Sequence, residues 1–167
     1  TYIHTRPSSI LPLAKLMAAT NRRLKNQLKV IFCDGEYLTE GQCQVIESAF
    51  NCRVVNIFGH TEGAAVGVAC TKSRNLHFMP QVGLIEVHAP NGQILSNEGE
   101  TGELIATGFN NYMFPLIRYR TGDIVQLGGE KCDCGRSYPL IKNIEGRMQD
   151  YVIGRNGAIA PLAPAIF

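Results

Sequence analysis

The stretches LKVIFCDG (residues 28–35) and RVVNIFG (residues 53–59) decide the fold class of this chain. Each contains a short apolar run that leads into a glycine and fits a buried strand better than a helix. The segment between them opens with Thr39-Glu40-Gly41-Gln42, which has capping-box spacing. Four residues then give the predicted helix one apolar side: Val45, Ile46, Ala49 and Phe50. Strand, helix and strand with short connections predict a parallel βαβ unit.

The segments on either side of this unit have different patterns. A helix is predicted to begin at Ser8 or Ser9 and to extend towards the basic residues 22–25, which favour a helix C-terminus. Its apolar residues recur at three- and four-residue spacing: Ile10, Leu13, Leu16 and Met17. After about residue 76, strand-like runs separated by glycine and asparagine turns occupy residues 82–88, 102–107 and 123–127. They predict a small antiparallel sheet or barrel.

Composition excludes several classes of protein. With 167 residues, 45% of them hydrophobic, and a net charge of +2, the chain is neither disordered nor a polycationic nucleic-acid binder. It has no apolar run long enough for a membrane span and no leader peptide, so we expect a soluble, cytoplasmic protein with no membrane partner. The first residue is not Met and both ends look unfinished, which suggests a piece of a longer protein.

Three polar clusters could carry chemistry. They are Asn56–Glu62, Tyr119–Asp123 and Gly146–Asp150. Taken singly, each also fits an ordinary turn or surface connector. Together, in this order and spacing, they resemble three signature motifs of the adenylate-forming superfamily of acyl-CoA and aryl-CoA ligases and adenylation domains. The similarity is greatest to the phenylacetate-CoA ligase branch, which includes relatives in capsular polysaccharide biosynthesis.

The resemblance implies a role for each motif residue. Phe58 takes the place of an aromatic residue, usually Tyr, that stacks on adenine beside Gly59. Thr61 would donate a hydrogen bond to the α-phosphate, and Glu62 would hold magnesium. His60 matches a variable position, so that a role facing the acyl substrate is only a guess.

Further residues complete the implied nucleotide site. Asp123 would accept hydrogen bonds from both ribose hydroxyls. Arg147 would reach the ribose or a phosphate near a hinge, with the pivot at Gln149 or its neighbour. Gly35 and Glu36 would line the adenine pocket.

The six cysteines divide into two groups. The branch often carries a Cys and a His after the first motif and a Cys-x-Cys-Gly-Arg later, which here implies a closed structural zinc site of Cys70, His77, Cys132 and Cys134. The alternative is four unligated side chains. The other three cysteines are predicted to be buried or incidental thiols: Cys33, Cys43 and Cys52.

The resemblance also sets the expected organisation and activity. Residues 1–75 would be an α/β portion of a large domain, residues 76–145 a β-rich subdomain, and residues 146–167 a hinge and the start of a further domain. The parent would be an ATP-dependent, AMP-forming acid–thiol ligase that passes an aryl or acyl carboxylate to CoA or another acceptor; a homodimer remains open. We expect the chain alone to be inactive. The alternative is a non-catalytic, zinc-stabilised binding or scaffold module with relic nucleotide motifs.

Overall fold

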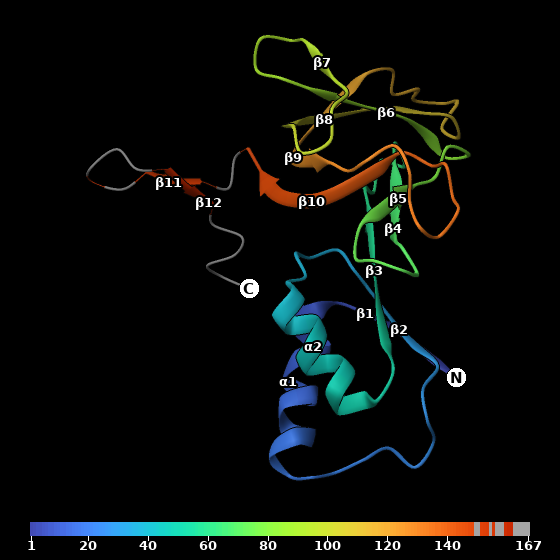
Figure 1. Cartoon of the computed structure of the whole chain (residues 1–167), viewed down its shortest axis with the longest axis vertical. Helices are drawn as coiled ribbons and strands as arrows, with labels where there is room; N and C mark the ends of the chain where they lie inside the picture. The colour runs from blue at the N-terminus through green and yellow to red at the C-terminus, as the bar shows by residue number, and fades with distance from the viewer. Residues whose placement is uncertain (149–150, 154, 156–158, 162–167) are drawn as a thin grey trace. The chain divides into compact units, whose positions relative to one another are not determined.

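The computed structural model describes residues 1–148, 151–153, 155 and 159–161. It divides into two compact units: unit 1 comprises residues 1–57, and unit 2 begins at Phe58 (Figure 1). The predicted pivot at Gln149 and Asp150 lies outside the described residues. Neither helix in the described part of the chain is long and apolar enough to cross a membrane.

Unit 1 contains three parallel strands and two helices. The strands are β1 (Tyr2–Thr5), β2 (Val30–Asp34) and β3 (Arg53–Gly59), with β2 in the middle. Val30 lies opposite Tyr2 on one side and Arg53 on the other. The helices are α1 (Pro7–Ala19) and α2 (Glu40–Phe50). The predicted βαβ unit is therefore confirmed as β2, α2 and β3, and β1 is a strand that the sequence patterns did not reveal.

Helix α2 begins where the capping box predicts. The Thr39 Oγ1 atom accepts a hydrogen bond from the Gln42 amide at 3.1 Å, and the Gln42 side chain accepts one from the Thr39 amide at 2.8 Å. The helix ends at Phe50, and its C-cap residue Asn51 has φ +50° and adopts the left-handed conformation. One face of α2 packs into the core of unit 1, and four of its residues are buried: Cys43, Ile46, Ala49 and Phe50.

Helix α1 differs from its predicted form at both ends. It begins at Pro7, whose missing amide hydrogen costs little at the first helical position, and it ends at Ala19, before the basic residues. Its buried face also differs, because Leu13 and Leu16 are 44% and 58% exposed. The buried residues of α1 are Pro7, Ile10, Ala14 and Met17.

Glu36 caps helix α1 from the loop that follows β2. One carboxylate oxygen accepts a hydrogen bond from the Ser8 amide at 2.8 Å, and the other accepts one from the Ser8 hydroxyl at 2.7 Å. A carboxylate at this position satisfies a free helix amide and interacts favourably with the helix dipole.

We expect Glu36→Ala to lower the free energy of unfolding by about 1 kcal/mol, because the first turn of α1 loses its cap. This loss corresponds to about 2–4 °C in the midpoint of thermal unfolding, which circular dichroism measures. Glu98→Ala, at an exposed acidic residue, is the control and should leave the midpoint unchanged. Equal midpoints for the two variants would contradict the capping role.

Unit 2 is built on an antiparallel sheet. Its strands follow the order β4 (Val66–Ala69), β5 (Leu76–Phe78), β10 (Leu140–Arg147), β9 (Tyr119–Leu127), β8 (Thr101–Gly108), β6 (Gly83–His88) and β7 (Ile94–Leu95). A separate pair consists of β11 (Tyr151–Ile153) and β12 (Ile159–Pro161). The antiparallel prediction is confirmed, but the strand order of this part runs from β4 to β7 without closing into a barrel.

Strand β9 is longer than the sequence patterns predict. It begins at Tyr119, so that the whole polar cluster Tyr119–Asp123 lies within a strand. Asp123 is consequently held between β8 and β10, where Arg147 is its register partner. Two irregularities interrupt the β9–β10 pairing, one of them just before Gly146, which has φ +125°.

Candidate functional site

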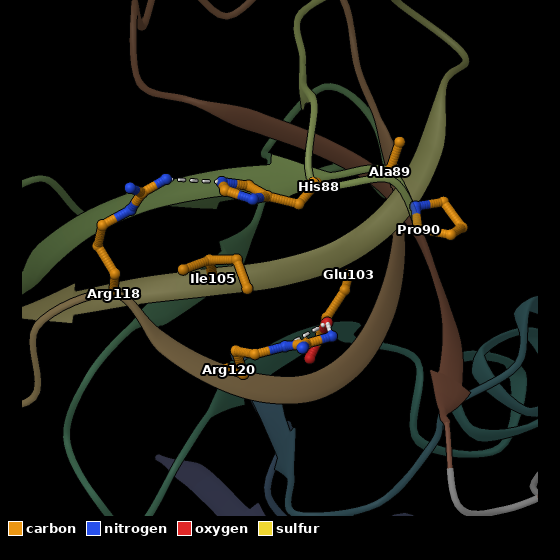
Figure 2. Close-up of a pocket in the computed structure, with 8 residues that line it drawn as sticks. His88, Ala89, Pro90, Glu103, Ile105, Arg118 and Arg120 are labelled. Atoms are coloured by element: carbon orange, nitrogen blue, oxygen red, sulfur yellow. Dashed lines mark hydrogen bonds and ion pairs between the residues drawn. The ribbon is translucent and has the colours of Figure 1, made fainter.

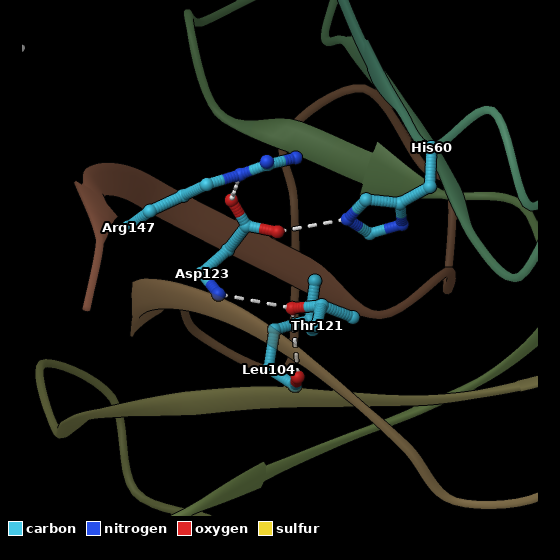
Figure 3. A network of polar contacts seen from close by, with 5 residues as sticks. All are labelled: His60, Leu104, Thr121, Asp123 and Arg147. Carbon is cyan, nitrogen blue, oxygen red and sulfur yellow. Dashed lines mark hydrogen bonds and ion pairs between the residues drawn. The ribbon is translucent and has the colours of Figure 1, made fainter. Parts of the chain in front are cut away.

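Three segments of unit 2 meet at the carboxylate of Asp123. The His60 Nε2 atom lies 2.8 Å from Asp123 Oδ2, and the Arg147 Nε atom lies 3.4 Å from Oδ1 (Figure 3). The Asp123 amide donates to the Thr121 hydroxyl, which in turn donates to the Leu104 carbonyl. The Asp123 side chain is only 6% exposed. A buried carboxylate held by two nitrogen atoms in this way has a fixed position and is suited to accept hydrogen bonds from a ligand.

Phe58 lies beside this network. Its ring centroid is 5.0 Å from that of His60 with the planes at 83°, and 5.7 Å from that of Phe78. Gly67 allows Phe78 to lie close to β4, because a Cβ at Gly67 would come within 2.8 Å of the Phe78 ring. The predicted adenine-stacking residue is thus held in a small aromatic group next to His60.

Thr61 and Glu62 lie in the turn that follows β3. The Gly63 amide donates to the His60 carbonyl at 2.9 Å, and Gly63 has φ +69°, a conformation that glycine adopts without strain. Both Thr61 and Glu62 are exposed, and Gly59 before them is the last residue of β3. This turn leaves a hydroxyl and a carboxylate accessible to a ligand.

The other predicted adenine-pocket residues belong to unit 1. Gly35 has φ +73° and follows Asp34, which pairs with His4 at 2.9 Å. The two Glu36 carboxylate oxygens accept hydrogen bonds from the amide and the hydroxyl of Ser8. Of the predicted nucleotide-site residues, the structure brings Phe58 next to the Asp123 network within unit 2, whereas Gly35 and Glu36 belong to unit 1.

The two arginines that precede Asp123 in the sequence, Arg118 and Arg120, make contacts outside the Asp123 network. Arg118 makes two hydrogen bonds to Glu86 and lies 3.4 Å from His88, while Arg120 pairs with the buried Glu103. His88, Glu103, Arg118 and Arg120 line a pocket of about 280 Å³ (Figure 2). The hydrogen bonds that Arg120 donates to Glu103, together with the negative charge of Glu103, raise the pKa of Arg120. Each guanidinium is matched by a carboxylate, so that the pocket has no excess positive charge for an anion.

A second candidate site is formed by Cys70, His77, Cys132 and Cys134, called here the Cys/His cluster. The four ligand atoms all lie within 4.8 Å of one another. Cys70 Sγ is 3.4 Å from Cys132 Sγ, and Cys134 Sγ is 3.2 Å from His77 Nε2. A tetrahedral zinc with Zn–S bonds of about 2.3 Å separates its sulfur ligands by about 3.8 Å, so the donor set fits this ion.

The surrounding backbone also suits a metal site. The Lys72 amide donates to Cys70 Sγ at 3.3 Å, and the Gly135 amide donates to the Cys132 carbonyl in a tight turn. Burial raises the pKa of Cys70. Hydrogen bonds from the backbone of Lys72 and Ser73 and from neighbouring side chains outweigh this effect and lower the pKa to about 5. A hydrogen bond from the Cys134 backbone lowers the pKa of Cys132, but burial and Cys70 together raise it to about 11.

The remaining cysteines agree with their predicted character as thiols outside any site. Cys33 and Cys43 are buried, and Cys52 is partly buried. Burial, followed by the nearby Cys43 and Asp34, raises the pKa of Cys33 to about 11, which keeps it a neutral and unreactive thiol.

His60 is the residue that the sequence patterns did not assign. Nothing local distinguishes it from any histidine beside a glycine turn, because its partner Asp123 is 63 residues away. Only the pairing of the intervening strands brings the two side chains together.

No protein-family model matches the chain. Individual known proteins are nevertheless similar to it over most of its length. It is 32% identical over 131 residues to a phenylacetate-coenzyme A ligase of Thermus thermophilus, which covers 74% of this chain and 28% of the relative. It is 32% identical over 148 residues to protein CapK of Staphylococcus aureus, covering 88% of this chain and 31% of the relative. The chain thus spans less than a third of the length of these curated relatives.

Solved structures agree on the fold. A 2-hydroxyisobutyryl-CoA ligase described in a postadenylation state matches 97% of this chain and 35% of its own, with a TM-score of 0.82 and 23% identity. A long-chain-fatty-acid-CoA ligase from Archaeoglobus fulgidus matches 90% of this chain and 34% of its own, with a TM-score of 0.66 and 16% identity. The chain therefore belongs to the adenylate-forming superfamily and corresponds to part of the phenylacetate-CoA ligases and CapK.

Proposed function

We propose that the protein carrying this sequence is an ATP-dependent, AMP-forming acid–thiol ligase and that this chain supplies much of its nucleotide site. The substrate carboxylate attacks the α-phosphorus of ATP to give an acyl-adenylate and pyrophosphate, and a thiol then displaces AMP. The phenylacetate-CoA ligase relatives favour an aryl acid as substrate and CoA as acceptor. The observation that carries the proposal is the buried Asp123 carboxylate held by His60 and Arg147.

Each side chain of the site has a proposed task. Asp123 accepts hydrogen bonds from the ribose hydroxyls, and the Phe58 ring stacks on adenine. Thr61 donates to the α-phosphate, and Arg147 reaches the ribose or a phosphate. Gly59 allows the backbone to approach the nucleotide, and Gly35 and Glu36 are proposed to contact the adenine.

Two metal ions complete the proposal. Magnesium, held by Glu62, supplies positive charge that offsets the phosphates. Zinc in the Cys/His cluster is structural, because three thiolates and one imidazole fill a tetrahedral shell and leave no open position for a reacting water. Inactivity of this chain by itself stays a prediction, and ATP–pyrophosphate exchange on the isolated chain tests it.

The Asp123→Asn variant tests the nucleotide site. In the full-length protein with ATP, magnesium, phenylacetate and CoA, we expect kcat/KM for ATP to fall about 10- to 100-fold. The reason is that an amide replaces one charged acceptor with a donor. AMP release measures the rate, and Glu98→Gln, at an exposed acidic residue outside both sites, is the control. If wild-type protein forms no AMP with any aryl or acyl acid, the ligase proposal is wrong.

The alternative function is a non-catalytic, zinc-stabilised module with relic nucleotide motifs. The Cys/His cluster fits this alternative as well as the ligase. ATP with magnesium separates the two, because ligand at 100 times its Kd raises the free energy of unfolding by about 2.7 kcal/mol. A thermal midpoint that does not change when saturating ATP and magnesium are added would favour the non-catalytic module.

A further inference from the structure

The buried imidazole of His60 uses only one of its two nitrogen atoms for a polar contact within the described residues. Its side chain is 3% exposed, and its Nε2 atom lies 2.8 Å from Asp123 Oδ2. The other ring nitrogen, Nδ1, is buried and has no hydrogen-bond partner among the described residues. A buried polar atom without a partner is unfavourable, so this imidazole is retained at a cost that its contact with Asp123 must offset.

The direction of the hydrogen bond follows from the chemistry of the partners. An ionised carboxylate can only accept, so the His60 Nε2 atom carries the proton and donates to Oδ2. The His60 ring packs nearly perpendicular to the Phe58 ring at a centroid distance of 5.0 Å, which restricts its rotation. His60 is therefore a fixed, buried donor.

Arg147 holds the other oxygen far less firmly. Its Nε atom is 3.4 Å from Oδ1, and its side chain is 60% exposed. A long contact from an exposed arginine is easily exchanged for a ligand or water, whereas the short, buried contact from His60 is not. The Oδ1 atom of Asp123 is thus more available to a ligand than the Oδ2 atom.

We propose that His60 is a positioning residue that fixes the Asp123 carboxylate through Oδ2 and leaves Oδ1 to select for ribose hydroxyls. The inference rests on the proposed function, because it takes the ligand of Asp123 to be a ribonucleotide. His60 itself touches no reacting atom; it acts through Asp123 and sets how strongly the site prefers ATP to a deoxy analogue.

The test compares ATP with 2′-deoxy-ATP and 3′-deoxy-ATP in the full-length protein. His60→Phe and His60→Met remove the donor at similar volume, and His60→Gln keeps an N–H donor. We expect the ratio of kcat/KM values for ATP and the deoxy analogues to fall about tenfold in the donor-free variants. The ratio should recover to within about threefold of wild type in His60→Gln. His4→Phe is the control, since His4 makes the same contact with Asp34 at an exposed site.

The outcomes separate this inference from the proposed function. A wild-type protein that forms AMP equally well from ATP and both deoxy analogues removes the ribose role of Asp123 itself. A wild type that prefers ATP, with donor-free variants that keep the same ratio, overturns only the role of His60. If both donor-free variants fail to fold, NMR of the His60 Nε2 proton in the wild-type protein provides the test. Its chemical shift should differ between AMP and 2′-deoxy-AMP, and equal shifts overturn the inference.

Discussion

Removal of zinc from the purified protein is expected to lower its thermal midpoint by about 8–16 °C. Structural zinc contributes roughly 10–16 kcal/mol to the folding of zinc-finger peptides. A conservative share of about 4 kcal/mol, at about 2–4 °C per kcal/mol for a chain of this size, gives the stated range. Cys134→Ser should have the same effect and reduce bound zinc from about one ion per chain to none.

The position of the Cys/His cluster explains this large effect. Cys70 and His77 belong to the β4–β5 hairpin, whereas Cys132 and Cys134 belong to the loop between β9 and β10. A metal shared by the two segments closes a long loop of the chain. Without the metal, the two segments lose the link that joins them.

Cys52→Ser is the matched control for the metal, because Cys52 is a free and partly buried cysteine outside the cluster. It should change neither zinc content nor the midpoint by more than about 2 °C. Elemental analysis gives the zinc content, and differential scanning calorimetry gives the midpoint. A purified protein that holds no zinc, and whose midpoint is the same with a chelator or with Cys134→Ser, would show that the cluster is four unligated side chains.

The second large effect is expected for Glu62→Gln in the full-length protein, which should slow adenylation about 1000-fold, or by about 4 kcal/mol in transition-state free energy. Replacing the carboxylate by an amide removes the negative charge that holds magnesium. Because Glu62 is exposed in the turn after β3, the thermal midpoint should not change.

Glu98→Gln, another exposed acid-to-amide change, controls for the general loss of charge. Pyrophosphate exchange over a range of magnesium concentrations provides the measurement, and high magnesium should partly restore the rate of Glu62→Gln. Near-normal exchange by Glu62→Gln at every magnesium concentration would remove this residue from the metal site.

Local signals account for the parts of the fold that were predicted well. The capping box at Thr39 and Gln42 involves atoms three residues apart, so the start of α2 can be read directly from the sequence. The apolar runs of β2 and β3 are similarly local. The Cys/His cluster was located through the resemblance to a family, because spacing alone does not bring Cys70 and Cys132 together.

The features that were missed depend on partners far away in the chain. Leu13 and Leu16 continue the helical apolar pattern of α1, but the core of unit 1 takes only the face that carries Ala14. Tyr119–Asp123 looks like a turn by composition, yet Glu103 on the neighbouring strand balances Arg120 and allows the strand to continue. His60 has no local signal because its partner lies on another strand.

The register of β9 and β10 has a consequence for the speed of nucleotide capture. Arg147 and Asp123 face each other as paired residues of two hydrogen-bonded strands, so their backbones are fixed relative to one another. If Arg147 binds the nucleotide as proposed, transfer of its guanidinium from Asp123 to the ligand requires only rotation about side-chain bonds. Rotations of exposed side chains take picoseconds to nanoseconds, whereas domain movements take microseconds or longer. Under the proposed function, the exchange of Arg147 between Asp123 and the nucleotide is therefore expected to be too fast to limit turnover.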